Sequence, residues 1–263
     1  NTGYQLAPLQ TPETLQRAVA TIQQFKAKLP VPFAFENTPS YLKPQPFEIP
    51  DGEFLAQVAE QADCGILLDL HNLWCNELNG RQPVSEVLAS LPPDRVWEIH
   101  LAGGEPYQGY WLDAHSGLVP PQLLELCHQW LPHFSQVKAI IFEIIPGYLI
   151  EKGLTTDNLL WQLEQLQQLW RQRQRTLQQP AAVTTHTGIP PAPAMPAPPQ
   201  QLWEHQLASL MNNRAVASPL AEFTSEPAIP ILQQLASSVR TGAITDLLTL
   251  SYRLLRLQLG KEA

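Results

Sequence analysis

Four short apolar segments constrain the fold of this chain more than any other feature of its sequence. They cover residues 33–36 (FAFE), 65–70 (GILLDL), 96–101 (VWEIHL) and 139–144 (AIIFEI). Each is a continuous apolar run without alternation of apolar and polar residues, which is typical of a strand buried on both faces in a parallel sheet. The stretches between them are long enough for the helix that connects two parallel strands.

Segments with helical periodicity separate these strands. Thr11-Pro12-Glu13 provides an N-cap, a proline at the first helical position and an early acid, so we expect a helix from there to about Leu29. Asp51 is expected to cap a second helix that reaches about Ala62. Further helices are expected over 84–91, over 120–131 and from Thr156-Asp157 onward. The alternating order predicts an α/β fold with a parallel sheet, either a barrel or a doubly wound sheet.

The composition changes near Gln178. Seven prolines lie between Pro180 and Pro199, which predicts an extended, semi-rigid linker. Helical patterns return at 201–215, 230–239 and 243–259. We therefore expect an α/β domain over 1–178, a Pro/Ala-rich linker over 179–200 and a small helical module over 201–263.

Charge, hydropathy and cysteine usage exclude several classes of partner. The net charge is −8 and no cationic track is present, which disfavours a nucleic-acid backbone. No apolar run approaches the roughly 20 residues of a membrane span, and no signal-peptide pattern begins the chain. Three cysteines without a close pair suggest a reducing, cytoplasmic setting. Because the first residue is Asn1, we expect a processed protein or a piece of something longer.

Carboxylates and imidazoles stand at the end of every predicted strand. Parallel strands of a barrel end at one face, where catalytic residues of such enzymes collect. Oxygen and imidazole donors without cysteine suit iron, manganese, magnesium or zinc. A single acid at a strand end is more often a helix cap or an ion-pair partner, but four strands that end alike favour a metal site. The candidates are Glu36, Asp69, Asn72, His100, Asp113, His115 and Glu143, whereas His71 stays undecided and Cys75 is expected to pack in the loop that carries Asn72.

Other chemistries account for fewer of these residues. The chain contains no GxSxG elbow, no glycine-rich phosphate loop and no dinucleotide fingerprint after a strand. Glu36 and Glu143 could serve as the acid pair of a glycosidase. That role would leave His100, Asp113 and His115 without a function.

Five motifs, in this order, carry a resemblance to a known family: FENTPSYL, LLDLHNLWCNELNG, DRVWEIHLAGG, LDAHSG and IIFEI. From about Leu6 to Leu177 the chain resembles the multinuclear non-haem iron-dependent oxidases, the MbnB-like family of methanobactin biosynthesis. The resemblance implies a xylose-isomerase-like (β/α)8 TIM barrel, of which this chain would supply the last four strands. It also implies two or three iron ions, with manganese or zinc as alternatives. The family uses dioxygen to modify cysteine, and sometimes other residues, in ribosomally made peptides, and often acts with a partner protein that recognises the substrate peptide.

The resemblance also assigns site residues. It implies that Glu36 is a bridging carboxylate, and that the other six candidates complete the cluster. The family usually has asparagine where His71 stands and often a polar residue near Ile144 and Ile145. Two further histidine ligands of the family come from the half of the barrel that this chain does not supply. A longer gene product, a second polypeptide or a degenerate remnant would each account for this.

Two alternatives remain open from the sequence. One is a different divalent-metal barrel enzyme, of the sugar isomerase or endonuclease kind, in which the metal acts as a Lewis acid. The other is a non-catalytic remnant retained as a binding scaffold. The helical tail is expected to be a peptide-recognition or docking module, or a pair of oligomerising helices.

Overall fold

In a computed structural model the chain divides into two compact units. One comprises residues 7–197, and the other comprises residues 1–6 and 198–263. The structure describes residues 6–177, 197–214, 216 and 226–247. Most of the predicted linker at 179–200 lies outside these residues, and so does the end of the predicted helix at 243–259. The proposed domain boundaries therefore stay predictions.

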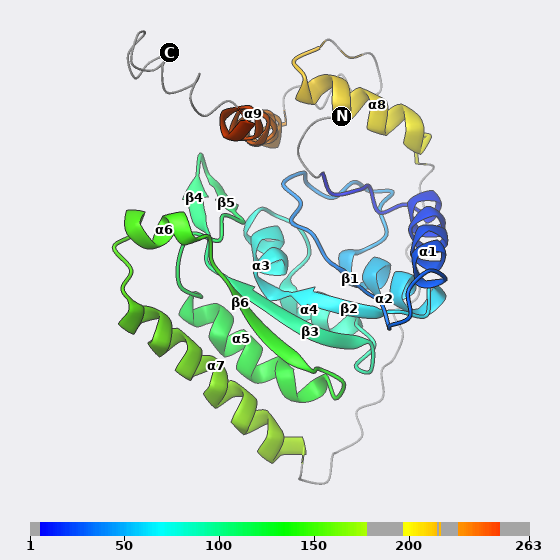
Figure 1. Cartoon of the computed structure of the whole chain (residues 1–263). Helices are drawn as coiled ribbons and strands as arrows, with labels where there is room; N and C mark the ends of the chain where they lie inside the picture. Colours follow the sequence, from blue (N-terminus) through cyan, green and yellow to red (C-terminus); the bar gives the residue numbers. More distant parts are fainter. Residues whose placement is uncertain (1–5, 178–196, 215, 217–225, 248–263) are drawn as a thin grey trace, which may run out of the picture. The chain divides into compact units, whose positions relative to one another are not determined.

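The larger unit is built on a parallel sheet of four strands in the order β1-β2-β3-β6 (Figure 1). The strands are β1 (Ala34–Glu36), β2 (Gly65–Asp69), β3 (Val96–Ala102) and β6 (Ala139–Glu143). All three pairings are parallel, with Glu36 beside Leu67, Asp69 beside His100 and Ala102 beside Glu143. The predicted α/β fold with a parallel sheet is confirmed. The described strands form an open sheet and do not close a barrel.

The predicted helices are present with small shifts at their ends. They are α1 (Pro12–Lys26), α2 (Asp51–Gln61), α4 (Val84–Ser90), α5 (Pro121–Trp130) and α7 (Thr156–Leu177). The Thr11 hydroxyl caps α1 by accepting a hydrogen bond from the Thr14 amide. The expectation that Asp51 caps α2 is wrong: Pro50 occupies that position without a side-chain hydrogen bond. Asp51 is instead buried against the guanidinium of Arg81.

A helix follows β2 directly where the sequence suggested a loop. This helix, α3 (Leu70–Leu78), begins at Asp69, whose Oδ1 accepts a hydrogen bond from the Asn72 amide at 2.8 Å. An aspartate in this position satisfies an amide that the first helical turn leaves without a partner. Asn72 and Cys75 are therefore helical residues, and the loop assignment is corrected.

Three short elements were not anticipated. Strands β4 (Glu105–Tyr107) and β5 (Tyr110–Leu112) form an antiparallel hairpin. Its two turn residues, Gln108 and Gly109, have φ values of 48° and 83°, as a two-residue turn that matches the strand twist requires. A 3-10 turn (Leu131–His133) follows α5, and α6 (Pro146–Glu151) follows β6.

The sheet has one packed face and one open face. Alternate side chains of the strands, among them Ile66, Leu68, Ile99 and Leu101, are buried in a core shared with the helices. Because strand side chains alternate, the intervening residues lie on the opposite face. There Glu36 is exposed, and Ile141 of β6 is 39% exposed. The prediction that all four strands are buried on both faces thus holds for most of β2 and β3 but fails for β1 and β6.

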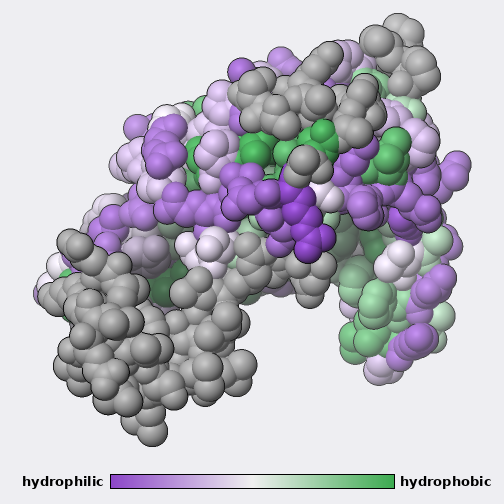
Figure 2. All heavy atoms as spheres, turned by 90° about the horizontal axis from the view of Figure 1, so that it is seen from above, coloured by the Kyte–Doolittle hydropathy of each residue, from purple (hydrophilic) through white to green (hydrophobic). Residues whose placement is uncertain are grey.

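The smaller unit contains two described helices, α8 (Gln200–Met211) and α9 (Ala228–Leu247). They meet where the Gln233 side chain donates a hydrogen bond to the Leu210 carbonyl at 2.7 Å. The break expected at 240–242 is wrong, because α9 continues through it. Across the described residues, no helix combines the length and apolar character needed to cross a membrane. On the face shown in Figure 2, hydrophobic residues form several groups among hydrophilic ones.

Candidate metal centre

The open face of the sheet brings most of the predicted site residues together at the C-terminal ends of the strands. Two sets of three residues have ligand atoms that all lie within 4.8 Å of one another. The first set is Glu36, Asp69 and His100, and the second is Asp69, His115 and Glu143. Asp69 belongs to both. The two sets therefore form one continuous cluster over all four strands and the loop that follows β5.

His100 faces this cluster with one ring nitrogen and is held by the other. Its Nε2 lies 2.8 Å from Oε1 of Glu98, two residues earlier on the same face of β3. Its Nδ1 is buried and has no hydrogen-bond partner among the described residues, although it lies 3.1 Å from Glu143 Oε1 and 3.7 Å from Glu36 Oε1. With Nε2–H donated to Glu98, Nδ1 carries the lone pair that a metal ion requires. His100 Nδ1 and Glu143 Oε1 lie close together without the alignment of a hydrogen bond, which fits two metal ligands that share one cation.

Asp69 and Asn72 each present a second unpartnered atom. Asp69 Oδ1 caps α3, whereas its Oδ2 is buried without a partner. Burial raises the pKa of Asp69 well above its usual range. The hydrogen bond from the backbone N–H of Asn72 lowers this pKa, whereas the nearby carboxylates of Asp113, Glu36 and Glu143 raise it further. The side-chain nitrogen of Asn72 donates a hydrogen bond to the backbone carbonyl of Asn37. The side-chain oxygen of Asn72, Oδ1, is buried and has no partner among the described residues. Buried polar atoms are rarely left without a partner, so Asp69 Oδ2 and His100 Nδ1, whose residues belong to one set of candidate ligands, fit a site that binds a cation.

Asn37 fixes the relative positions of the first two strand ends. Its side-chain oxygen accepts from the Asp69 amide at 2.9 Å, and its side-chain nitrogen donates to the Asp69 carbonyl at 2.9 Å. Both bonds act on the backbone of Asp69 and leave its carboxylate free to face the cluster.

Asp113 and His115 enter from the loop after the hairpin. His115 Nε2 lies 3.0 Å from Asp113 Oδ1 and 3.6 Å from Glu143 Oε2. Burial alone would raise the pKa of Asp113, but hydrogen bonds with His115 and His71 outweigh it and lower the pKa to about 2. The same bond to Asp113 raises the pKa of His115. His115 has a φ of 48°, a left-handed conformation that is uncommon for a residue with a side chain.

The cluster brings several carboxylates close together. Among the described residues, no lysine or arginine forms an ion pair with Glu36, Asp69, Asp113 or Glu143. Burial raises the pKa of Glu36, and the neighbouring Glu143 and Asp113 raise it further against the effect of His100. Several carboxylates, two imidazoles and an amide oxygen are a donor set that suits iron, manganese or zinc. The residues therefore fit a cation.

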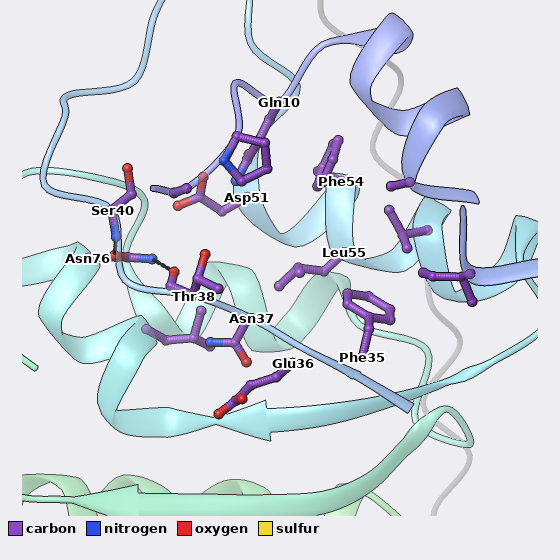
Figure 3. Close-up of a pocket in the computed structure, with 16 residues that line it drawn as sticks. Gln10, Phe35, Glu36, Asn37, Thr38, Ser40, Asp51, Phe54, Leu55 and Asn76 are labelled. Atoms are coloured by element: carbon purple, nitrogen blue, oxygen red, sulfur yellow. Dashed lines mark hydrogen bonds between the residues drawn. The ribbon is translucent and has the colours of Figure 1, made fainter. Parts of the chain in front are cut away.

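A cavity of about 170 Å³ opens beside Glu36 (Figure 3). Phe35, Phe54 and Leu55 form an apolar part of its wall. Asn76 contributes to the polar part and holds the loop that follows β1, since it accepts a hydrogen bond from the Ser40 amide and donates one to the Thr38 carbonyl. Arg81 fastens the same loop through the Leu42 carbonyl.

The other described histidines, and the three cysteines, are not among the grouped ligands. His71, undecided from the sequence, is fully buried and contacts Asp113 and Trp111. His128, His133 and His205 are exposed, whereas His186 lies outside the described residues. Cys75 is buried in packing contact with the His71 ring, and burial raises the pKa of its thiol. The sequence analysis did not assign roles to Glu98 and His71. Only the i, i+2 spacing of Glu98 and His100 pointed to the first.

Comparison with known proteins decides the family. A family model described as "RiPP precursor modification enzyme MbnB/TglH/ChrH" matches residues 2–144. The chain belongs to this family. All seven predicted site residues fall within the part that matches the MbnB/TglH/ChrH model. Its members are named as modification enzymes of RiPP precursors, the ribosomally made peptides that are modified after synthesis.

Several relatives named as UPF0276 proteins match part of the chain. One from Anaeromyxobacter sp. (strain Fw109-5) is 37% identical over 140 residues, which cover 53% of this chain and 50% of the relative. One from Acaryochloris marina is 35% identical over 137 residues, 52% of this chain and 50% of the relative. One from Chromobacterium violaceum is 44% identical over 84 residues, 32% of this chain and 30% of the relative. The chain thus spans about half the length, or less, of these relatives.

Proposed function

We propose that the chain forms part of an iron-dependent enzyme that uses dioxygen to oxidise a cysteine, or another residue, of a RiPP precursor peptide. The observation that carries this proposal is that three buried atoms have no hydrogen-bond partner among the described residues: Asp69 Oδ2, Asn72 Oδ1 and His100 Nδ1. Membership of the MbnB/TglH/ChrH family supports a peptide substrate. The proposed ligands are Glu36, Asp69, Asn72, His100, Asp113, His115 and Glu143.

The residues of this chain would bind and orient the reacting groups. Bound iron, as two or three ions, would supply the electron exchange with dioxygen and the attraction for a thiolate that side chains lack. Glu98 holds the His100 ring, and the cap on α3 holds Asp69. Such a reaction would balance if the peptide lost four electrons and four protons while one dioxygen molecule was reduced to two waters. Manganese or zinc would suit the same donors but would not favour this redox role.

We infer further that the sheet is the last half of a (β/α)8 barrel. Parallel strands, helices on one face and an open polar face are what half of such a barrel would present. The partly exposed Ile141 on β6 fits a strand whose neighbour lies outside these residues. The half-length match to the relatives agrees with this reading. The other half, from the same polypeptide or another chain, would add ligands and cover both edge strands, and the tail beyond the linker would engage a partner or the peptide.

Metal content tests the proposal. Protein would be loaded with iron(II) under nitrogen, freed of excess metal and assayed for iron per folded chain and for dioxygen uptake. We would compare this chain, the longest product of its own reading frame and a Glu36→Gln variant, with the exposed Glu60→Gln as matched control. Iron bound by the longer product, lost in Glu36→Gln and kept in Glu60→Gln, is the expected result. Binding of magnesium or manganese without dioxygen uptake would favour a Lewis-acid enzyme, and no metal in any protein would favour a scaffold.

A further inference from the structure

His71 is a buried histidine, and each of its two ring nitrogens lies within hydrogen-bonding distance of a neighbouring side chain. Its Nδ1 lies 2.9 Å from Oδ1 of Asp113, and its Nε2 lies 3.2 Å from the indole nitrogen of Trp111. An indole nitrogen can only donate a hydrogen bond, so Nε2 must be the acceptor. The proton of the neutral ring is then on Nδ1, where it is donated to Asp113. The chemistry of the neighbours thus selects one tautomer.

Trp111 is held in place by α3, the helix that also carries His71. The Asn79 side chain accepts from the Trp111 amide and donates to the Trp111 carbonyl, both at 2.9 Å. Asn79 stands at the C-terminal end of α3 and His71 in its first turn. The hairpin strand β5 is therefore fastened to both ends of this helix.

Gly104 allows this close approach. A Cβ atom at this position would lie 2.5 Å from Trp111 Nε1 and 2.7 Å from His71 Nε2. Both distances are shorter than a side-chain atom tolerates. A glycine that leaves room for one particular hydrogen bond indicates that the bond between Trp111 and His71 is a built feature of the fold.

We propose that His71, held in its Nδ1-protonated form by Trp111, is a positioning residue that orients the Asp113 carboxylate toward a metal ion. This rests on the metal site of the proposed function. His71 and His115 both contact Oδ1 of Asp113. The other carboxylate oxygen, Oδ2, would then be the one that binds a cation. His71 does not itself face the cluster, so it acts through Asp113. Partners of this kind in known metal sites change metal affinity by about 10- to 100-fold when they are removed.

Three substitutions separate positioning from simple packing. Leucine at position 71 (His71→Leu) fills similar space without a donor. Asparagine (His71→Asn) places its side-chain N–H close to the former Nδ1–H and can restore the bond to Asp113. Trp111→Phe keeps an aromatic ring and removes the donor that selects the tautomer. The exposed His133→Asn is the matched control.

The readout is affinity for cobalt(II), measured by anaerobic titration of its visible spectrum, with thermal melting to verify folding. We expect His71→Leu to weaken binding about 10- to 100-fold, His71→Asn to recover to within about threefold of wild type, and His133→Asn to change nothing. Trp111→Phe should fall between His71→Leu and wild type. Equal affinities for wild type and His71→Leu, both folded, would overturn the positioning role and leave the metal site standing.

Nitrogen-15 NMR of the metal-free protein gives an independent readout. The long-range couplings of the His71 ring should report Nδ1–H and an unprotonated Nε2 in wild type, and a mixture of tautomers in Trp111→Phe. A wild-type ring protonated on Nε2 would refute the proposal directly. If the longest product of the reading frame, without substitutions, binds no cobalt(II), the proposed metal site fails, and the positioning role that rests on it fails as well.

Discussion

Glu98 and His100 form a carboxylate–imidazole pair on one face of β3, with Nε2 of the ring 2.8 Å from the carboxylate. The other ring nitrogen, buried and unpartnered, lies on the side of Glu143 and Glu36. A histidine that ligates a metal commonly donates its other N–H to a carboxylate, which fixes the ring and makes the ligating nitrogen more basic. Glu98 therefore adds to the case for a metal site, although only His100 of this pair belongs to the predicted ligand set.

Removal of the Glu98 carboxylate should weaken metal binding. Glu98→Leu loses both the hydrogen bond and the charge, so cobalt(II) or iron(II) affinity should fall about 10- to 100-fold. Glu98→Gln keeps an oxygen that can accept from Nε2–H, and its loss should be smaller. Anaerobic titration measures both, with the exposed Glu86→Gln as control. Unchanged affinity in folded Glu98→Leu would mean that His100 does not ligate through Nδ1.

Asp69 should show opposite effects on metal binding and on the stability of the metal-free protein. Its folded pKa is raised, chiefly by burial, so the protonated form is favoured on folding. The stability that this group contributes is present below its unfolded pKa and is lost as the pH rises through its higher folded pKa. Asp69→Asn resembles the protonated form and keeps a good helix cap. Without metal it should therefore be more stable than wild type at neutral pH and should lose metal binding.

Urea unfolding with a chelator, repeated between pH 4 and pH 8, tests this expectation. The advantage of Asp69→Asn over wild type should grow as the pH rises. Asp69→Ala is the comparison that also loses the cap, and it should be about 1 kcal/mol less stable than Asp69→Asn. An Asp69→Asn variant that is destabilised at every pH would show that the carboxylate is compensated by contacts within the protein.

Metal should stabilise the folded chain in proportion to its affinity. A ligand that binds only the folded state adds about 2.7 kcal/mol when its concentration is 100 times its dissociation constant. Cobalt(II) should therefore raise the free energy of unfolding of wild type, and a chelator should reverse the change. Glu36→Gln should show a much smaller increase, and Glu60→Gln the full one. An equal increase in both variants would place the bound ion elsewhere.

Local sequence alone was enough to predict that carboxylates and imidazoles at the strand ends lie close together. The apolar runs located the strands, and parallel strands bring their ends together whatever the details of packing. Helix α3 was missed because His71, Asn72 and Asn76 are weak helix formers. The Asp69 cap and the burial of Leu70 and Leu73 override that preference. The hairpin was missed because its strands have three residues each, and one contains Pro106.

The supporting residues of the site depend on contacts that no local pattern encodes. His71 reaches Asp113 across 42 residues of sequence, and Trp111 meets Asn79 across 32. Such pairs follow from where α3 and the hairpin pack, which the sequence analysis did not predict. The sequence placed Glu98 on a predicted strand. Only the observed hydrogen bond to His100 distinguishes it from a solvent-exposed acid without a role in the site.

Gly104→Ala should disrupt the contact between the hairpin and α3. The added Cβ would lie 2.3 Å from the Leu112 carbonyl oxygen, in addition to its close approach to Trp111 and His71. Trp111 Nε1 and His71 Nε2 share a hydrogen bond, and the Leu112 oxygen belongs to the backbone, so a shift of any of these atoms would disturb the fold. We therefore expect the free energy of unfolding to fall by about 1–3 kcal/mol. Gly117→Ala is the matched control, since a Cβ there meets nothing within 4 Å.

Chemical unfolding of both alanine variants, with the Trp111 indole N–H followed by NMR, measures the effect. In Gly104→Ala the indole resonance should shift toward that of a hydrogen bond to water, and cobalt(II) affinity should fall together with it. Gly117→Ala should retain the wild-type resonance and affinity. If Gly104→Ala were as stable as wild type and kept the indole resonance, the hairpin would have enough freedom to move away from α3. The close packing that holds His71 against Trp111 would then not be required for the site.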